Sequence, residues 1–306
     1  MNKKIEIKRL LIFLLIAFGL VWGAMFTYFG LDGEYGTSTC NAILMLAMLC
    51  PAIASLVTIK LTKEKMWVSV EENRNSEGNQ LPSLRLGISF KNKKWVWFPV
   101  AIFGMLLCME LGYVIIWLIE PDVINFEILK ISGITKTLAT LIPIAGITSG
   151  VMFSIGALGE ELGWRSYMVP KMEKLFGTVG AILLGNIIWG IWHFPSIAKG
   201  HAFGLDYKGA PYTGYLVFTL SCVAMGAFLQ LLVEKANSVW PAVFAHAINN
   251  TGASILGMCV DRSKLSGAMA EPTVFLLIHM IPQIILGVVS VVVLVRMRKK
   301  QKEENN

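Results

Sequence analysis

The sequence predicts an all-α fold: a polytopic bundle of about eight transmembrane helices that forms a single domain over residues 1–306. Hydrophobic residues make up 55% of the chain and charged residues only 15%, and the mean hydropathy is +0.62. Such a composition is too apolar for an ordinary soluble domain. In addition, apolar runs of about 20 residues, long enough to cross a bilayer, recur along the chain.

Each of these runs is a candidate transmembrane helix. The first follows a basic segment and is long enough to span, so we expect an uncleaved helix there rather than a cleaved signal peptide. No internal repeat of 20 to 50 residues is present, and this favours one domain. The runs cover residues 10–31, 40–61, 95–119, 138–169, 176–195, 211–233, 239–259 and 273–295.

Basic residues predict the orientation of the helices. Lysine and arginine gather in the N-terminal tail, in the loop 62–94 and in the C-terminal segment from Arg296 to Lys300. With eight spans, all three segments face one side, which the positive-inside rule assigns to the cytoplasm. The net charge of +7 therefore reflects topology and not a nucleic-acid site. We expect a multi-pass cell-membrane protein with both termini in the cytoplasm.

Ionisable residues interrupt the later apolar runs. Glu160, Glu161 and Arg165 lie in the fourth run, His193 in the fifth and His246 in the seventh. Each such group costs about 2.5 to 3.5 kcal/mol on insertion scales, so a group of this kind usually marks a working site. Taken one at a time, each feature also has a structural explanation: charges in the headgroup layer, a histidine in an aromatic belt, or a polar clasp between helices.

Helix geometry separates the two glutamates. Neighbouring residues point about 100° apart, whereas Glu161 and Arg165 stand at i and i+4, the spacing of an ion pair. We therefore expect Glu161 to be structural and Glu160 to be free for chemistry. If the helix runs on to Val169 and stops before Pro170, Glu160 lies about 15 Å inside the membrane. His193 and His246 then reach the same layer.

These side chains suit the hydrolysis of an amide bond. A carboxylate and an imidazole, Glu160 and His193, can deprotonate a water between them. His246 and Asn250 share one helix face and are donors suited to the negative charge that develops on the carbonyl oxygen. Alternatively, Glu160, His193 and His246 could ligate zinc with one position open for water. The sequence favours neither the metal-dependent nor the metal-independent mechanism.

Three short motifs resemble those of the CPBP family of intramembrane proteases, also called the Abi or CAAX-processing family, which includes the type II CAAX prenyl endopeptidases. The match covers about residues 145–255, and the predicted eight spans agree with the family fold. The motifs are Glu-Glu-x-x-x-Arg, Phe-x-x-x-His with Trp189 in place of the phenylalanine, and His-x-x-x-Asn. The matching positions are Glu160, Glu161 and Arg165, then Trp189 and His193, then His246 and Asn250.

The resemblance implies an intramembrane endopeptidase whose substrate is a membrane protein or peptide. It implies that Glu160 and His193 activate water, that His246 and Asn250 stabilise the oxyanion, and that Arg165 supports the first motif. CAAX-like cleavage, bacteriocin maturation and self-immunity are all associated with bacterial members.

Two other functions stay open at this level. A transporter would explain the further ionisable residues Glu110 and His279, although the matching broken helices of a typical transporter are missing from the two halves of the sequence. A non-catalytic scaffold or immunity protein would keep the motifs as polar clasps between helices.

Overall fold

The computed structural model describes residues 3–64, 84–88, 90–127, 150, 153–252 and 254–304. Within these ranges the regular structure is helical, apart from one isolated bridge between Ile124 and Val260. This confirms the all-α class. The longer helices are α1 (Lys3–Gly30), α2 (Ser38–Ala47), α3 (Cys50–Leu61), α5 (Trp97–Ile119), α8 (Ser154–Glu161), α9 (Val169–Trp192), α11 (Tyr212–Ala236), α12 (Trp240–Thr251), α14 (Pro272–His279) and α15 (Ile281–Glu304).

Short helices complete the described part of the chain. They are the 3₁₀ helix η1 (Lys91–Val96), the 3₁₀ helix η2 (Pro121–Val123), the π-helix η3 (Leu162–Met168), α10 (Phe194–Ile197), α13 (Ile255–Met258), and the 3₁₀ helices η4 (Arg262–Lys264) and η5 (Gly267–Ala270).

Six helical stretches of the described residues are long and apolar enough to cross a membrane, against about eight predicted. Part of the difference lies in how one stretch is counted, since Ser154–Trp192 contains α8, η3 and α9 and folds back on itself. Gly177 has φ +72° and ψ 174°, a conformation open to glycine, and it breaks α9. The six stretches are Lys3–Gly30, Ser38–Leu61, Lys91–Ile119, Ser154–Trp192, Tyr212–Ala236 and Ile281–Glu304.

Contacts across the Gly177 break show that the chain turns back there. The indole of Trp189 hydrogen-bonds Glu160, although 29 residues of straight helix would separate them by about 43 Å. The rings of Trp164 and Trp192 lie 5.9 Å apart. Two antiparallel helices therefore replace one long helix here, as the predicted runs 138–169 and 176–195 required; residues 138–149 lie outside the described ranges.

The seventh predicted span, 239–259, was too long. Helix α12 contains only 12 residues, from Trp240 to Thr251, and ends at Gly252, whose φ of +63° caps it in the left-handed conformation. At 1.5 Å per residue, α12 rises about 18 Å and does not cross a whole bilayer. The apolar residues that follow Gly252 thus belong to a connection that contains the short helix α13, and not to a transmembrane helix.

The expected helix end before Pro170 was also wrong. The chain passes from α8 into the π-helix η3, and α9 then begins at Val169 with Pro170 in its first turn. Proline is tolerated at that position because it lacks an N–H and the first helical N–H groups have no partner in the helix. The wider turns of η3 supply the new start, so the helix continues to Gly177.

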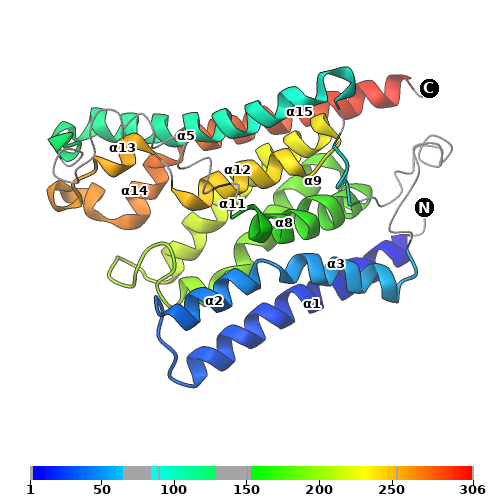
Figure 1. Cartoon of the computed structure of the whole chain (residues 1–306), viewed down its shortest axis with the longest axis horizontal. Helices are drawn as coiled ribbons and strands as arrows, with labels where there is room; N and C mark the ends of the chain where they lie inside the picture. Colours follow the sequence, from blue (N-terminus) through cyan, green and yellow to red (C-terminus); the bar gives the residue numbers. More distant parts are fainter. Residues whose placement is uncertain are drawn as a thin grey trace.

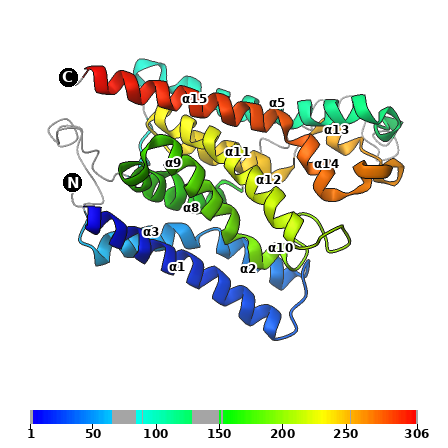
Figure 2. The same ribbon diagram turned by 180° about the vertical axis from the view of Figure 1, so that it is seen from behind.

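Helix α11 lies at the centre of the bundle. Its apolar window is 67% buried, whereas the other five windows are 39% buried or less. Helices α1, α2 and α3 form one side of the bundle and α5 with α15 the other (Figures 1 and 2). Glycines permit the close packing, because a Cβ on Gly226 would collide with Asn186 of α9 and one on Gly287 would strike the backbone of Ala224.

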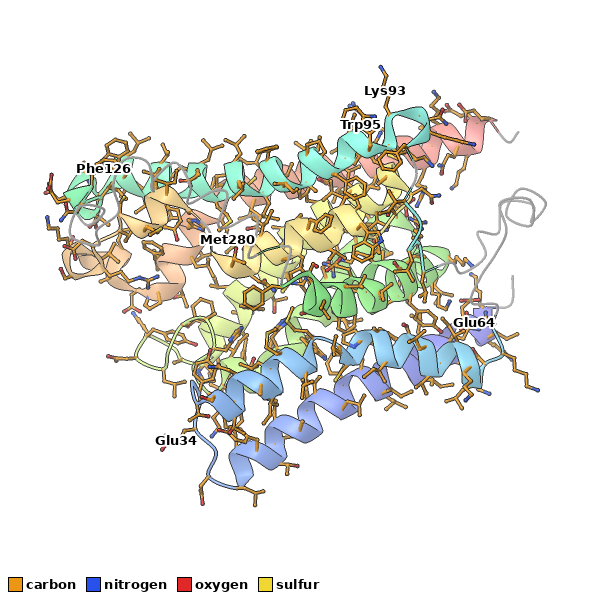
Figure 3. All side chains as sticks on the ribbon, in the orientation of Figure 1. Glu34, Glu64, Lys93, Trp95, Phe126 and Met280 are labelled. Atoms are coloured by element: carbon orange, nitrogen blue, oxygen red, sulfur yellow. The ribbon has the colours of Figure 1, made fainter. Side chains whose placement is uncertain are left out.

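A buried ion cluster ties the start of α1 to the end of α3. Glu64 lies 2.8 Å from Nζ of Lys171 and 3.4 Å from Nε of Arg9, and it accepts a 2.7 Å hydrogen bond from the hydroxyl of Tyr167. Figure 3 places Glu64 at the end of the bundle where α1 begins and Glu34 at the opposite end. Both termini lie at the same end as Glu64 (Figure 1), as the basic segments predicted.

Acid should weaken this cluster. Burial alone would raise the pKa of Glu64, but the ammonium of Lys171 and the hydrogen bonds of Lys171 and Tyr167 outweigh it and hold the pKa below its ordinary value of 4.5. The stabilisation is therefore present above about pH 4.5 and is lost as the pH falls through the lowered pKa. In wild type, we expect the thermal unfolding temperature in detergent to fall as the pH drops through this pKa. This fall should be absent in Glu64→Gln and present in Glu303→Gln, a change at an exposed residue. An identical pH profile for wild type and Glu64→Gln would contradict the assignment.

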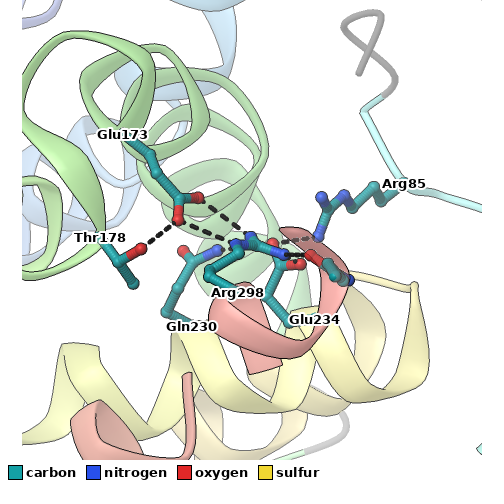
Figure 4. A network of polar contacts seen from close by, with 7 residues as sticks. Arg85, Glu173, Thr178, Gln230, Glu234 and Arg298 are labelled. Atoms are coloured by element: carbon teal, nitrogen blue, oxygen red, sulfur yellow. Dashed lines mark hydrogen bonds and ion pairs between the residues drawn. The ribbon is translucent and has the colours of Figure 1, made fainter. Parts of the chain in front are cut away.

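A second ion network anchors the C-terminal helix (Figure 4). Arg298 of α15 contacts Glu173 of α9 at 2.9 Å and Glu234 of α11 at 3.0 Å. Arg85 contacts the same Glu234 at 2.7 Å. These contacts join α9, α11, α15 and the segment before η1 at one end of the bundle.

Candidate active site

One cavity of about 610 Å³ contains all four residues predicted to do chemistry. Glu160 comes from α8, His193 from the end of α9, and His246 with Asn250 from α12. Another part of the lining, an apolar wall, comes mainly from α1 and α2. Its members include Val21, Met25, Leu44, Met45 and Met48. The cavity therefore combines polar and apolar lining residues.

Glu160 is held by a tryptophan. Its side chain is only 2% exposed, and its Oε2 accepts a 2.6 Å hydrogen bond from Nε1 of Trp189. This bond occupies one carboxylate oxygen, and the residue also lines the cavity. A buried carboxylate with a single neutral donor keeps acceptor capacity, which a general base needs.

His193 lies at a break between helices rather than deep within one. It caps the C-terminus of α9 and precedes α10. Its Nδ1 lies 2.9 Å from the carbonyl oxygen of Trp189, so the Nδ1–H donates and Nε2 of the neutral ring is left with its lone pair. The ring packs against Trp192 and Phe218, each at 4.7 Å between centroids.

Arg165, Glu161 and His246 form a buried chain of polar contacts. Glu161 lies 3.3 Å from Nε of Arg165, and both side chains are fully buried, which confirms the predicted i to i+4 pair. The other carboxylate oxygen of Glu161 lies 2.8 Å from Nδ1 of His246. The second contact joins residues 85 positions apart and could not be read from spacing. Glu161 thus links the first motif to the third and orients the ring of His246.

Trp189 contacts residues of all three motifs, a role that the sequence did not reveal. Besides bonding Glu160, its ring lies 5.3 Å from the ring of His246 and beneath the guanidinium of Arg165, at 4.1 Å from Cζ to the centroid. Its carbonyl oxygen holds His193. The available signal was its place four residues before His193, on the same helix face.

Replacing Trp189 with phenylalanine isolates the role of the indole N–H. The ring under Arg165 is kept, but the donor to Glu160 is lost, so the carboxylate can rotate away from its position. If Glu160 is the base, we expect kcat to fall by about tenfold to a hundredfold, since small displacements of a catalytic group have effects of this size. The measurement is peptide cleavage by purified protein, with Trp97→Phe as the matched tryptophan control. An unchanged kcat in Trp189→Phe would contradict this role.

Asn250 lies exposed at the cavity beside Asn249, one helical turn after His246. The sequence also left open a zinc site formed by Glu160, His193 and His246. Across the residues that the structure describes, no group of three or more histidine, cysteine or acidic side chains is arranged to hold a metal ion. Instead, Trp189 engages one oxygen of Glu160 and Glu161 engages Nδ1 of His246.

Glu110 and His279, which suggested a transporter, lie outside the cavity lining. Both oxygens of Glu110 accept backbone N–H groups in the first turn of α13, from Ile255 at 2.6 Å and Leu256 at 3.2 Å. The ring of His279 packs on Tyr113 at 4.3 Å. A carboxylate that accepts the first N–H groups of a helix has a structural role, so these contacts account for Glu110 without ion transport.

Comparison with known proteins gives two matches. Residues 142–252 match the family model described as type II CAAX prenyl endopeptidase Rce1-like, and this range contains the four cavity residues that the sequence predicts to do chemistry. CAAX prenyl protease 2 of Methanococcus maripaludis is 27% identical over 108 residues. The aligned segment covers 35% of this chain and 40% of that relative.

Proposed function

We propose that the chain is an intramembrane protease of the CPBP family, as its similarity to the Rce1-like model and to a CAAX prenyl protease suggests, and that it hydrolyses a peptide bond of a membrane-associated protein or peptide. The observation that carries the proposal is the shared cavity, in which an acid, two imidazoles and a carboxamide from three helices meet. A polytopic helical membrane protein with such a buried polar site is suited to act on a substrate that enters from the bilayer.

Glu160 and His193 activate the water in this proposal. Glu160 takes one proton of the water while Nε2 of His193 accepts a hydrogen bond from the other. The water oxygen then bonds to the carbonyl carbon of the substrate, and the electron pair of the carbonyl moves to its oxygen. Glu160 returns the proton to the leaving nitrogen, the C–N bond breaks, and a carboxylic acid and an amine are released.

His246 and Asn250 stabilise the charged oxygen in the same scheme. Asn250 supplies an amide N–H. His246 already directs its Nδ1 toward Glu161, so Nε2 can donate only when the ring is an imidazolium. The carboxylate of Glu161 orients the ring through this contact. Two donors beside a developing oxyanion contribute about 2.7 to 4 kcal/mol each in well-studied hydrolases.

The apolar wall of the cavity favours a substrate with a large apolar group next to the scissile bond. CAAX-like proteins and bacteriocin-type peptides both meet this condition. Because lysines and arginines cluster at one end of the bundle, we place this end, with both termini, in the cytoplasm.

Comparison of peptide termini in membranes tests the proposed function. Membranes of cells that express the wild-type protein, no protein or Glu160→Ala are digested, and the new termini are quantified by mass spectrometry. We expect a set of termini in membrane-associated proteins that requires the wild type and is absent from the other two samples. Termini that persist with Glu160→Ala would refute Glu160 as the base, and identical termini in all three samples would refute the protease function.

A further inference from the structure

The turn after α10 carries a third histidine, His201, into the same cavity. Its ring is nearly parallel to that of His193, with 8° between the planes and 6.5 Å between the centroids. Phe218 contacts both rings, at 4.7 Å for His193 and 5.9 Å for His201. His193 is therefore enclosed by Trp192 on one side, Phe218 on another and His201 across the cavity.

The backbone around His201 adopts conformations that favour this placement. Gly200 has φ +104° and Ala202 has φ +69°. Positive φ is unfavourable for alanine, and residues in such conformations cluster at functional sites. The backbone N–H of His201 bonds the carbonyl of Ser196 at 3.0 Å. The turn is thus tight, and it carries strain at the residue that follows the histidine.

The turn is also fixed from both sides. Beneath it, Ile197, Phe203 and Tyr207 are buried in one hydrophobic cluster. Above it, the hydroxyl of Tyr35, in the connection between α1 and α2, lies 3.0 Å from Nδ1 of His201. The ammonium of Lys199 lies 5.3 Å from the ring centroid of Phe29 at the end of α1. These contacts join the turn that carries His201 to α1 and to the connection that follows it.

We propose that His201, oriented by Tyr35, is a positioning residue that keeps the imidazole of His193 directed at the attacking water. The proposal deepens the proposed protease function and depends on it for its kinetic part. The hydrogen bond to the carbonyl of Trp189 fixes one edge of the His193 ring, and the nearly parallel ring of His201 faces it from the other side of the cavity. Burial lowers the pKa of His201, so its ring is neutral near pH 7 and adds no charge beside His193.

Three variants separate the ring from its hydrogen bond. His201→Ala opens the space and should lower kcat by about tenfold to a hundredfold while KM changes by less than about twofold. His201→Phe keeps an aromatic wall and should restore kcat to within about threefold of wild type. Tyr35→Phe removes one hydroxyl, and its kcat should lie between those of His201→Ala and His201→Phe. The control is Tyr212→Phe, at an exposed tyrosine. The probe is a quenched fluorescent peptide that carries a cleavage sequence found by the terminal comparison.

A spectroscopic readout tests the contact without catalysis. The chain has four histidines, so the imidazole ¹⁵N resonances of labelled protein in detergent can be assigned with single variants. We expect the Nε2 resonance of His193 to shift in His201→Ala and to stay near its wild-type position in His201→Phe and Tyr212→Phe. This outcome is independent of whether the protein cleaves anything.

Two results would overturn the proposal. The first is an unchanged His193 resonance in His201→Ala. The second is a rise in KM with an unchanged kcat, because His201 would then bind the substrate directly. A wild-type protein that cleaves no peptide, with the His193 resonance still sensitive to His201, would refute the protease function and leave the contact established.

Discussion

Glu160→Gln is expected to lower cleavage by about 10²- to 10⁴-fold, the usual contribution of a general base, while the protein still folds. The amide has nearly the shape of the carboxylate, and its oxygen can still accept the hydrogen bond from Nε1 of Trp189. It cannot take a proton from water. The measurement is kcat in proteoliposomes with the substrate found by the terminal comparison, together with thermal unfolding as the test of folding.

The matched control is Glu110→Gln. Glu110 is also a carboxylate inside an apolar helix, but its oxygens accept the N–H groups of Ile255 and Leu256 and it does not line the cavity. A glutamine there keeps one acceptor, so cleavage should stay within about twofold of wild type. Equal activity of Glu160→Gln and wild type would remove Glu160 from the mechanism. Counter-ion-dependent flux that survives Glu160→Gln would support a transporter instead.

Local spacing predicted the parts of the site that lie within one helix. The pair of Glu161 and Arg165 follows from i to i+4 geometry, and the shared face of His246 and Asn250 follows from the same periodicity. The pairing of Glu161 with His246 does not, because it depends on how α12 packs against α8. Trp189 stands where the second motif usually has phenylalanine. Its N–H bond to Glu160 also depends on how two helices pack and does not follow from spacing.

Composition predicted the all-α membrane bundle, because a long apolar run has few alternatives to a helix in a bilayer. Helix ends were harder to place. Pro170 predicts the end of a helix, but the preceding π-helix lets α9 start with proline in its first turn. Apolar residues after Thr251 extended the seventh predicted span, whereas Gly252 ends α12. Both errors come from backbone geometry that hydropathy does not report.

The remaining alternative, a scaffold that keeps the motifs as polar clasps, would use the same buried contacts for a different purpose. A clasp requires paired groups and needs no free acceptor. Glu161 and Arg165 fit that description, whereas Glu160, His193 and His246 each have one side-chain atom in a hydrogen bond and line the cavity. The surroundings of these three residues therefore favour chemistry over a clasp. Partner binding that is unchanged in Glu160→Ala and His193→Ala, without any cleavage, would favour the scaffold.

Arg165→Met is expected to destabilise the folded protein by about 3 to 5 kcal/mol, the cost of leaving one partner of a buried ion pair alone. Methionine keeps the apolar stem against Trp189 but removes the charge. Glu161 is then left, fully buried, with His246 as its partner. The measurement is the free energy of unfolding in detergent with increasing denaturant.

The double variant Arg165→Met with Glu161→Gln distinguishes a lost charge from lost packing. If the cost of Arg165→Met comes from an uncompensated carboxylate, neutralising Glu161 should recover more than about half of it, because removing both ions of a buried pair is often nearly neutral. Activity should not recover, since the carboxylate that orients the ring of His246 is missing from the double variant. Additive losses in the double variant would show that Arg165 stabilises the bundle by its contact with Trp189, and the ion pair would then have no measurable share in the stability.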